Sequence, residues 1–122
     1  MKYVIIGNSA AGVSAVEGIR SADAAGEIVV ISEERFPVYG RPLISYYLLG
    51  ATDRSRMNYR PEDFYEKMGV RLMPGERAER IDVSAKEVVL KSGVRVGYDK
   101  LLVATGSRPF DPPMEGLGEV KQ

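Results

Sequence analysis

The apolar residues of this chain fall into short unbroken runs. Residues 3–6, 28–31 and 101–104 each hold four consecutive apolar side chains. Runs of this kind are typical of strands that are buried on both faces, as in a parallel sheet. We therefore expect parallel strands over residues 2–6 and 28–31, and a returning central strand over residues 101–104.

The stretch between the first two runs has the period of a helix. Val13, Val16 and Ile19 recur at helical spacing, and small residues between them permit close packing against a sheet. Arg20 suits the last turn of such a helix. The pattern predicts a helix over residues 10–22, which completes one βαβ unit with the two strands.

The remaining pattern predicts a mixed α/β fold. The sequence does not show the second strand-helix-strand half of a simple nicotinamide dehydrogenase, and prolines mark a rigid loop after the second strand. We expect a Rossmann-like parallel sheet with an antiparallel β-meander in residues 1–110, followed by a linker rich in proline and glycine over residues 111–122. The other expected elements are a loop over 36–42, helices over 44–49 and 61–69, a third parallel strand over 70–73, and meander strands over 77–83, 87–90 and 94–96.

A glycine-marked turn joins the first strand to the helix. Gly7, Ser9 and Gly12 form a G-x-S-x-x-G pattern, in which Ser9 takes the place of the middle glycine of the dinucleotide fingerprint. The free N–H groups and the partial positive charge of a helix N-terminus favour a phosphate at this turn. Gly7 permits a tight turn, and Gly12 permits close packing of helix on strand. On its own, the pattern also fits a plain turn with a serine near a helix N-terminus.

An acidic residue follows the second strand at the spacing that a ribose site requires. Glu33 lies 21 residues beyond Gly12, close to the roughly 20 residues expected for a carboxylate that binds ribose hydroxyls. Such a carboxylate accepts hydrogen bonds from both hydroxyls and repels a 2′-phosphate. The alternative is a solvated acidic loop after a strand.

The composition narrows the classes of function. With 122 residues the chain has room for one domain, and its 17 basic and 17 acidic residues give no net charge to attract nucleic acid. No apolar run is long enough to span a membrane, and we expect a cytoplasmic protein. The chain has no cysteine and no histidine, so we expect no catalytic side chain, no metal site and redox chemistry only through a bound cofactor.

Together these features resemble the N-terminal FAD-binding segment of the pyridine nucleotide-disulfide oxidoreductase superfamily. The resemblance is greatest to its cysteine-free branch of rubredoxin and ferredoxin reductases, NADH oxidase-like proteins and the nitrite reductase large subunit. The motifs that carry it are the turn over 7–12, the strand ending at Glu33, and the segments 39–46 and 98–109. The implied FAD contacts are Gly7, Ser9, Ala10, Ala11 and Gly12 at the pyrophosphate, Glu33 with Glu34 at the adenosine ribose, Arg41 and Pro42 near the pyrophosphate and flavin, Ala78 at the adenine, and Ala104, Thr105 and Gly106 in the second flavin motif.

Some of these positions also have simpler interpretations. Arg41 also fits a solvated arginine in a loop, and Thr105 with Gly106 also fits an ordinary turn at a strand end. Two departures limit what the resemblance implies. Tyr46 stands where many relatives carry a lysine beside the reactive edge of the flavin, so the electron acceptor is not implied. The absence of cysteine makes a thiol or coenzyme A disulfide an unexpected substrate.

The resemblance implies an enzyme in its intact form. That enzyme passes hydride from NAD(P)H to FAD, and electrons go on to an unidentified acceptor, which includes the possibility of an acceptor protein. The alternative is a non-enzymatic module that binds ADP, AMP or NAD. The resemblance also implies that residues 111–122 lead to an NAD(P)H-binding domain. We expect the 122-residue chain alone to bind FAD or its ADP part weakly, if at all, not to turn over NADH, and to self-associate through uncovered apolar surface.

Overall fold

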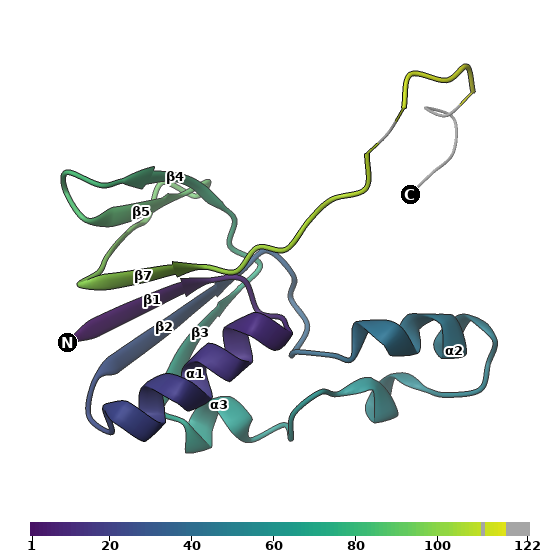
Figure 1. Ribbon diagram of the computed structural model, residues 1–122, viewed down its shortest axis with the longest axis horizontal. Helices are drawn as coiled ribbons and strands as arrows, with labels where there is room; N and C mark the ends of the chain where they lie inside the picture. Colours follow the sequence, from purple (N-terminus) through teal and green to yellow (C-terminus); the bar gives the residue numbers. More distant parts are fainter. Residues whose placement is uncertain (111, 117–122) are drawn as a thin grey trace.

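The computed structural model describes residues 1–110 and 112–116. Its main feature is a parallel sheet with the strand order β3-β2-β1-β7, and a second, antiparallel sheet has the order β4-β5-β6. The long helix α1 lies along one face of the parallel sheet, and the antiparallel sheet lies over the other (Figure 1). The parallel strands are β1 (Lys2–Ile6), β2 (Glu27–Ser32), β3 (Val70–Pro74) and β7 (Lys100–Val103); the antiparallel strands are β4 (Ala78–Asp82), β5 (Glu87–Leu90) and β6 (Arg95–Gly97); α1 is Ala10–Ala22.

The unbroken apolar runs supply two cores, one on each face of the parallel sheet. Alternate residues of a strand point to opposite faces. In β1, Val4 and Ile6 therefore pack with the antiparallel sheet, whereas Ile5 packs with Val13 and Val16 of α1. This three-layer arrangement confirms the predicted fold class, the predicted bounds of β1 and α1, and the predicted meander.

Arg20 connects the carboxyl-terminal ends of two helices. Its guanidinium donates hydrogen bonds to the carbonyl oxygens of Met68 at 2.6 Å and Gly69 at 3.0 Å, just after the short helix α3 (Phe64–Lys67). It also donates to those of Asp23 at 3.2 Å and Gly26 at 2.6 Å, between α1 and β2. A cation here also complements the negative end of the α1 dipole.

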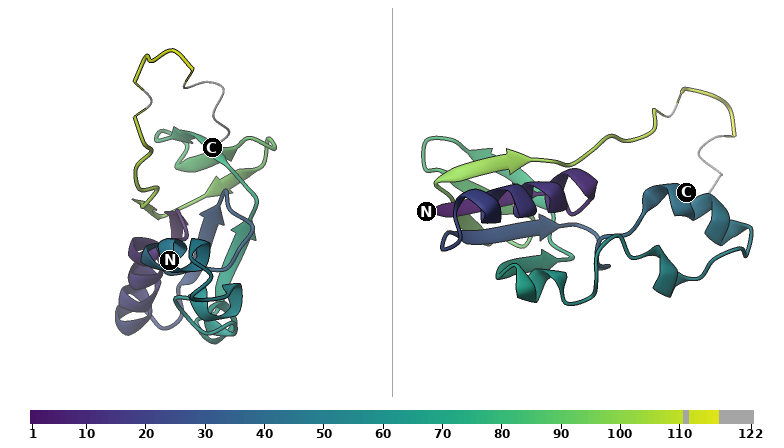
Figure 2. Two further views of the ribbon diagram at one scale, coloured as in Figure 1. Left: turned by 90° about the vertical axis from the view of Figure 1, so that its right-hand side faces the viewer. Right: turned by 60° about the horizontal axis from the view of Figure 1, so that its bottom comes forward.

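Between β2 and β3 the chain makes a long excursion, which we define as residues 36–62. It extends away from the sheets (Figures 1 and 2) and contains three short helical segments. Its two legs pair through the Gly40 N–H and the Met57 carbonyl oxygen at 2.7 Å. Near the end of the excursion, Arg60 forms a bidentate ion pair with Glu17 of α1, in which its Nε and Nη2 atoms donate to the two carboxylate oxygens at 2.8 and 3.1 Å. This ion pair lowers the pKa of Glu17. The helical segments are η1 (Arg41–Leu43), α2 (Ile44–Leu48) and η2 (Arg54–Met57).

Two expectations about this region and the end of the sheet were wrong. The helix expected over residues 61–69 is only α3, because the Phe64 N–H bonds to Pro61 in a turn and the α-helical bonding begins at Asp63. The strand expected at the centre of the sheet is β7, which pairs only with β1 among the described residues and is therefore an edge strand. Its Val103 accordingly remains 55% exposed.

The predicted linker over residues 111–122 is described only in part. Residues 108–110 and 112–116 form no helix or strand, and this segment leads away from the sheets (Figure 2). Residues 111 and 117–122 of the predicted linker lie outside the described residues.

Candidate functional site

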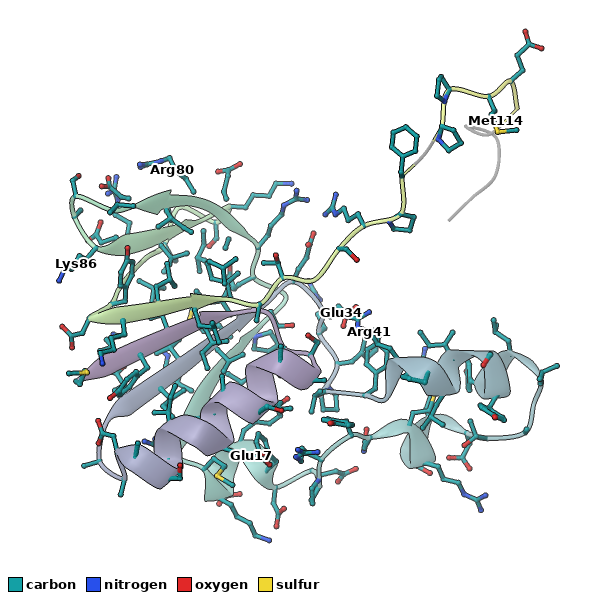
Figure 3. All side chains as sticks on the ribbon, in the orientation of Figure 1. Glu17, Glu34, Arg41, Arg80, Lys86 and Met114 are labelled. Carbon is teal, nitrogen blue, oxygen red and sulfur yellow. The ribbon has the colours of Figure 1, made fainter. Side chains whose placement is uncertain are left out.

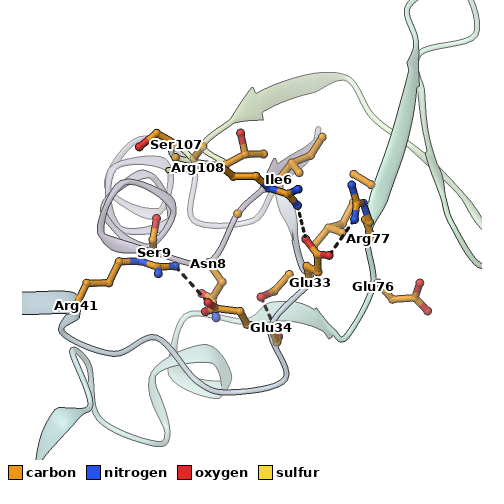
Figure 4. Close-up of a pocket in the computed structure, with 17 residues that line it drawn as sticks. Ile6, Asn8, Ser9, Glu33, Glu34, Arg41, Glu76, Arg77, Ser107 and Arg108 are labelled. Carbon is orange, nitrogen blue, oxygen red and sulfur yellow. Dashed lines mark hydrogen bonds and ion pairs between the residues drawn. The ribbon is translucent and has the colours of Figure 1, made fainter. Parts of the chain in front are cut away.

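A cavity of about 460 Å³ opens at the carboxyl ends of β1, β2 and β7 (Figure 4). These strands are parallel neighbours, so their carboxyl ends meet at one edge of the sheet, where α/β folds generally bind ligands. The predicted site residues that line the cavity are Gly7, Ser9, Glu33, Glu34, Arg41, Ala78, Ala104, Thr105 and Gly106. The structure does not bring Ala10, Ala11, Gly12 or Pro42 into its lining.

Gly7 is held in a conformation and a space that only glycine fits well. Its φ is +116°, and a Cβ at this position would overlap the carbonyl oxygen of Ala104 and lie 2.7 Å from its carbonyl carbon. The Gly7 N–H donates to the Ile31 carbonyl oxygen at 2.9 Å, and the Ala104 N–H donates to that of Ile6 at 2.8 Å. The turn is therefore fixed between the ends of β2 and β7, with no room for a side chain.

The start of α1 presents unpaired donors beside this turn. Ser9 is the N-cap residue, but its hydroxyl makes no capping hydrogen bond. The first intrahelical bond runs from the Val13 N–H to the Ser9 carbonyl oxygen at 3.0 Å, which leaves the N–H groups of residues 10–12 without an intrahelical acceptor. Gly12 lets the helix approach the turn, because a Cβ there would overlap the carbonyl oxygen of Gly7. Any role of Ala10, Ala11 and Gly12 in binding thus rests on their backbone.

At one end of the cavity, Glu33 lies between two arginines that the sequence analysis missed. Its carboxylate is 3.3 Å from Arg77 and 3.8 Å from Arg108 (Figure 4). Glu33 itself follows β2, Arg77 precedes β4, and Arg108 follows β7. All three side chains are about half exposed or more, so these ion pairs contribute little to stability and can open. A carboxylate that faces the cavity between cations is available to ribose hydroxyls.

At the other end, Arg41 is held by Glu34 and Tyr39. Arg41 lies 3.4 Å from the Glu34 carboxylate (Figures 3 and 4) and donates to the Tyr39 hydroxyl oxygen at 3.1 Å. The Tyr39 hydroxyl in turn donates to Glu34 at 3.1 Å, and burial followed by this hydrogen bond raises the pKa of Tyr39. Arg41 therefore sits at the rim of the cavity in an organised cluster, with a guanidinium that an anion could recruit.

Asn8 adds a buried polar group that fits an acceptor-rich ligand. It lines the cavity next to Gly7, and its Nδ2 atom is buried without a hydrogen-bond partner among the described residues. Free helix N–H groups, this amide and nearby arginines match the diphosphate of a dinucleotide, and Glu33 matches a ribose. The lining residues that sequence reasoning missed are Ile6, Asn8, Ile31, Ser32, Glu76, Arg77, Ser107 and Arg108.

Two other kinds of site find no support in the described residues. No group of three or more acidic side chains there could hold a metal ion. None of the helices in that part of the chain has the length and apolar character that crossing a membrane requires.

Comparison with known proteins finds similar chains among reductases. The chain is 34% identical over 117 residues to a probable ferredoxin reductase, CtmF, of Castellaniella defragrans. The alignment covers 95% of this chain and 29% of that protein. It is 38% identical over 118 residues to the large subunit of the nitrite reductase (NADH) of Escherichia coli. This alignment covers 95% of this chain and 14% of that subunit. One chain of a crystal structure of the covalent putidaredoxin reductase–putidaredoxin complex superimposes on this chain with a TM-score of 0.88 at 28% identity. The superposition covers 97% of this chain and 29% of the chain in the complex.

The chain thus spans less than a third of the length of each of these relatives. The family model for pyridine nucleotide-disulphide oxidoreductases matches residues 1–122, the whole chain. The chain therefore belongs to the pyridine nucleotide-disulphide oxidoreductase family.

Proposed function

We propose that this chain binds FAD as the flavin-binding segment of an NAD(P)H-dependent oxidoreductase. The observation that carries the proposal is that the Gly7 turn and Glu33, predicted separately from the sequence, line one cavity. In this proposal the diphosphate lies against the first turn of α1, and Glu33 accepts hydrogen bonds from the adenosine ribose. Bound FAD would supply the hydride-accepting chemistry that no side chain of this chain provides.

The role of the protein in this proposal is binding and orientation. Backbone N–H groups of residues 10–12 donate to phosphate oxygens, and Arg41 leaves Glu34 to neutralise their charge. Ala78 leaves space for the adenine, and Gly106, with a φ of +72°, lets the backbone turn beside the nucleotide. The co-substrate NAD(P)H and an electron acceptor, including an acceptor protein, complete the proposed reaction.

The first test is a comparison of ligands by thermal unfolding. A ligand that binds only the native state raises the unfolding midpoint by mass action. We expect FAD to raise it more than ADP at equal concentration, because FAD carries the whole ADP group and further contacts, and NAD to raise it less than FAD. A rise with ADP equal to that with FAD would favour a non-enzymatic adenine-nucleotide module instead, and no rise with any of the three would overturn the proposal.

A second test removes the charge of the proposed ribose acceptor. Glu33→Gln keeps the shape of the side chain but replaces a charged acceptor by a neutral one. We expect the dissociation constant for ADP, measured by isothermal titration calorimetry, to rise by roughly tenfold, because hydrogen bonds to charged groups are worth about 1.5–3 kcal/mol. Glu79→Gln is the matched control, since Glu79 is exposed on β4 and does not line the cavity. An equal affinity in the two variants would argue against a ribose contact at Glu33.

A further inference from the structure

Tyr65 connects three segments of the chain through its hydroxyl group. The hydroxyl donates to the Oδ1 atom of Asn8 at 2.7 Å and accepts a hydrogen bond from the Val38 N–H at 3.2 Å. Tyr65 itself lies in α3, Val38 lies near the start of the excursion, and Asn8 belongs to the turn that lines the cavity. One side chain thus links the excursion to the proposed diphosphate site.

The direction of these bonds fixes the orientation of the Asn8 amide. A backbone N–H can only donate, so the bond from Val38 uses the Tyr65 oxygen as acceptor and leaves the O–H free to donate. That O–H requires an acceptor, which must be the Oδ1 atom of Asn8. The NH₂ half of the amide is therefore the one left over, and Nδ2 is indeed the buried atom without a partner.

A buried donor without an acceptor is costly, and native structures rarely leave one unexplained. Nothing in the described fold uses this NH₂ group, although Asn8 lines the cavity at the Gly7 turn. The ligand proposed for this cavity carries phosphate oxygens, which are strong acceptors. Because Nδ2 is buried, the contact requires a small side-chain adjustment of the kind that commonly accompanies binding.

We propose that Asn8 donates a hydrogen bond from its side-chain amide to the diphosphate of the dinucleotide, and that Tyr65 is the positioning residue that orients this amide. The inference rests on the proposed function, because it assigns residues to the same ligand. It goes beyond the fingerprint, in which backbone groups alone contact the phosphates. The hydrogen bond from the Val38 N–H to the Tyr65 hydroxyl oxygen also connects this pair to the excursion.

The test measures ADP binding by isothermal titration calorimetry in Asn8→Ala, Tyr65→Phe and the double variant. We expect Asn8→Ala to weaken ADP binding by roughly tenfold, as loss of a hydrogen bond to a charged group implies. Tyr65→Phe should weaken it by a few fold, because the amide is then free to turn. In the Asn8→Ala background, Tyr65→Phe should cause no further loss of affinity, although it should still lower the unfolding midpoint.

The control is Tyr98→Phe, since Tyr98 is also half-buried, but packs against the core on the other face of the sheet. It should leave ADP affinity unchanged. Equal ADP affinity in the native protein and in Asn8→Ala would overturn the inference while leaving the proposed function intact. No binding of either ADP or FAD by the native protein would overturn the proposed function itself. If Tyr65→Phe does not fold, Asn8→Leu decides: it has nearly the shape of asparagine but no NH₂ group, and an ADP affinity equal to that of the native protein would overturn the inference.

Discussion

Gly7→Ala is expected to destabilise the protein by about 3 kcal/mol or more and to abolish nucleotide binding. Two effects add at this position: a φ of +116° strains any residue with a Cβ, and that Cβ would overlap the carbonyl oxygen of Ala104. Relief of the overlap requires the chain at Ala104 to move away from the Gly7 turn, which distorts the cavity at the carboxyl ends of β1 and β7. The free energy of unfolding from urea denaturation measures the first effect, and calorimetry with ADP measures the second.

Gly18→Ala is the matched control for this variant. Gly18 lies inside α1, and a Cβ there would meet no atom within 4 Å. Alanine at a helical position that can accept it stabilises a protein by about 0.4–1 kcal/mol. We expect the two substitutions, chemically identical, to change stability in opposite directions. If Gly7→Ala were as stable as the native protein, the close approach of Ala104 to the turn would be wrong.

Arg20→Ala is expected to lower the free energy of unfolding by about 3 kcal/mol or more. It would remove a partly buried guanidinium that donates to four backbone carbonyl groups. A single hydrogen bond to a charged group contributes about 1.5–3 kcal/mol, and the contributions of four bonds from one side chain are not fully additive. Arg20→Lys should recover only part of this, because an ammonium group cannot reach the ends of both helices with the geometry of a planar fork. Urea denaturation of the two variants gives the comparison.

Arg80→Ala provides the control for charge alone. Arg80 lies on β4, its side chain is 56% exposed, and it forms an ion pair with Asp82 at 3.3 Å. Removal of such a surface pair usually costs less than 1 kcal/mol. A loss from Arg20→Ala as small as that from Arg80→Ala would contradict the role of Arg20 as a link between α1 and α3.

The elements that the sequence predicted well are those with a local cause. The apolar run at residues 3–6 and the helical spacing of Val13 and Val16 each require only a few neighbouring residues, and both β1 and α1 have the predicted bounds. The helix over residues 61–69 was overestimated because proline at its start suited a longer helix, whereas the chain forms a turn at Pro61 and the α-helical bonding begins only at Asp63.

The residues of the candidate site that could be predicted from the sequence are those that belong to a known motif. Gly7 and Glu33 follow known spacings, and both line the cavity. Asn8, Arg77 and Arg108 were missed because their surroundings come from distant segments: Tyr65 for Asn8, and Glu33 for both arginines. The charge of the two arginines was a visible signal, but the sequence did not show that the start of the meander and the exit from β7 meet at Glu33. The roles of these residues in binding remain predictions for the tests above.

The contact between Gly7 and Ala104 has a consequence for the order of folding. The Gly7 turn is encoded in the first dozen residues, yet the group that closes against it belongs to the strand end furthest along the chain. Contacts between such distant segments form late, because a large loop must close first. A ribosome would therefore have to release almost all of the described residues before the cavity could take its final shape, and a nascent chain that stops short of Ala104 should have the helix without the cavity.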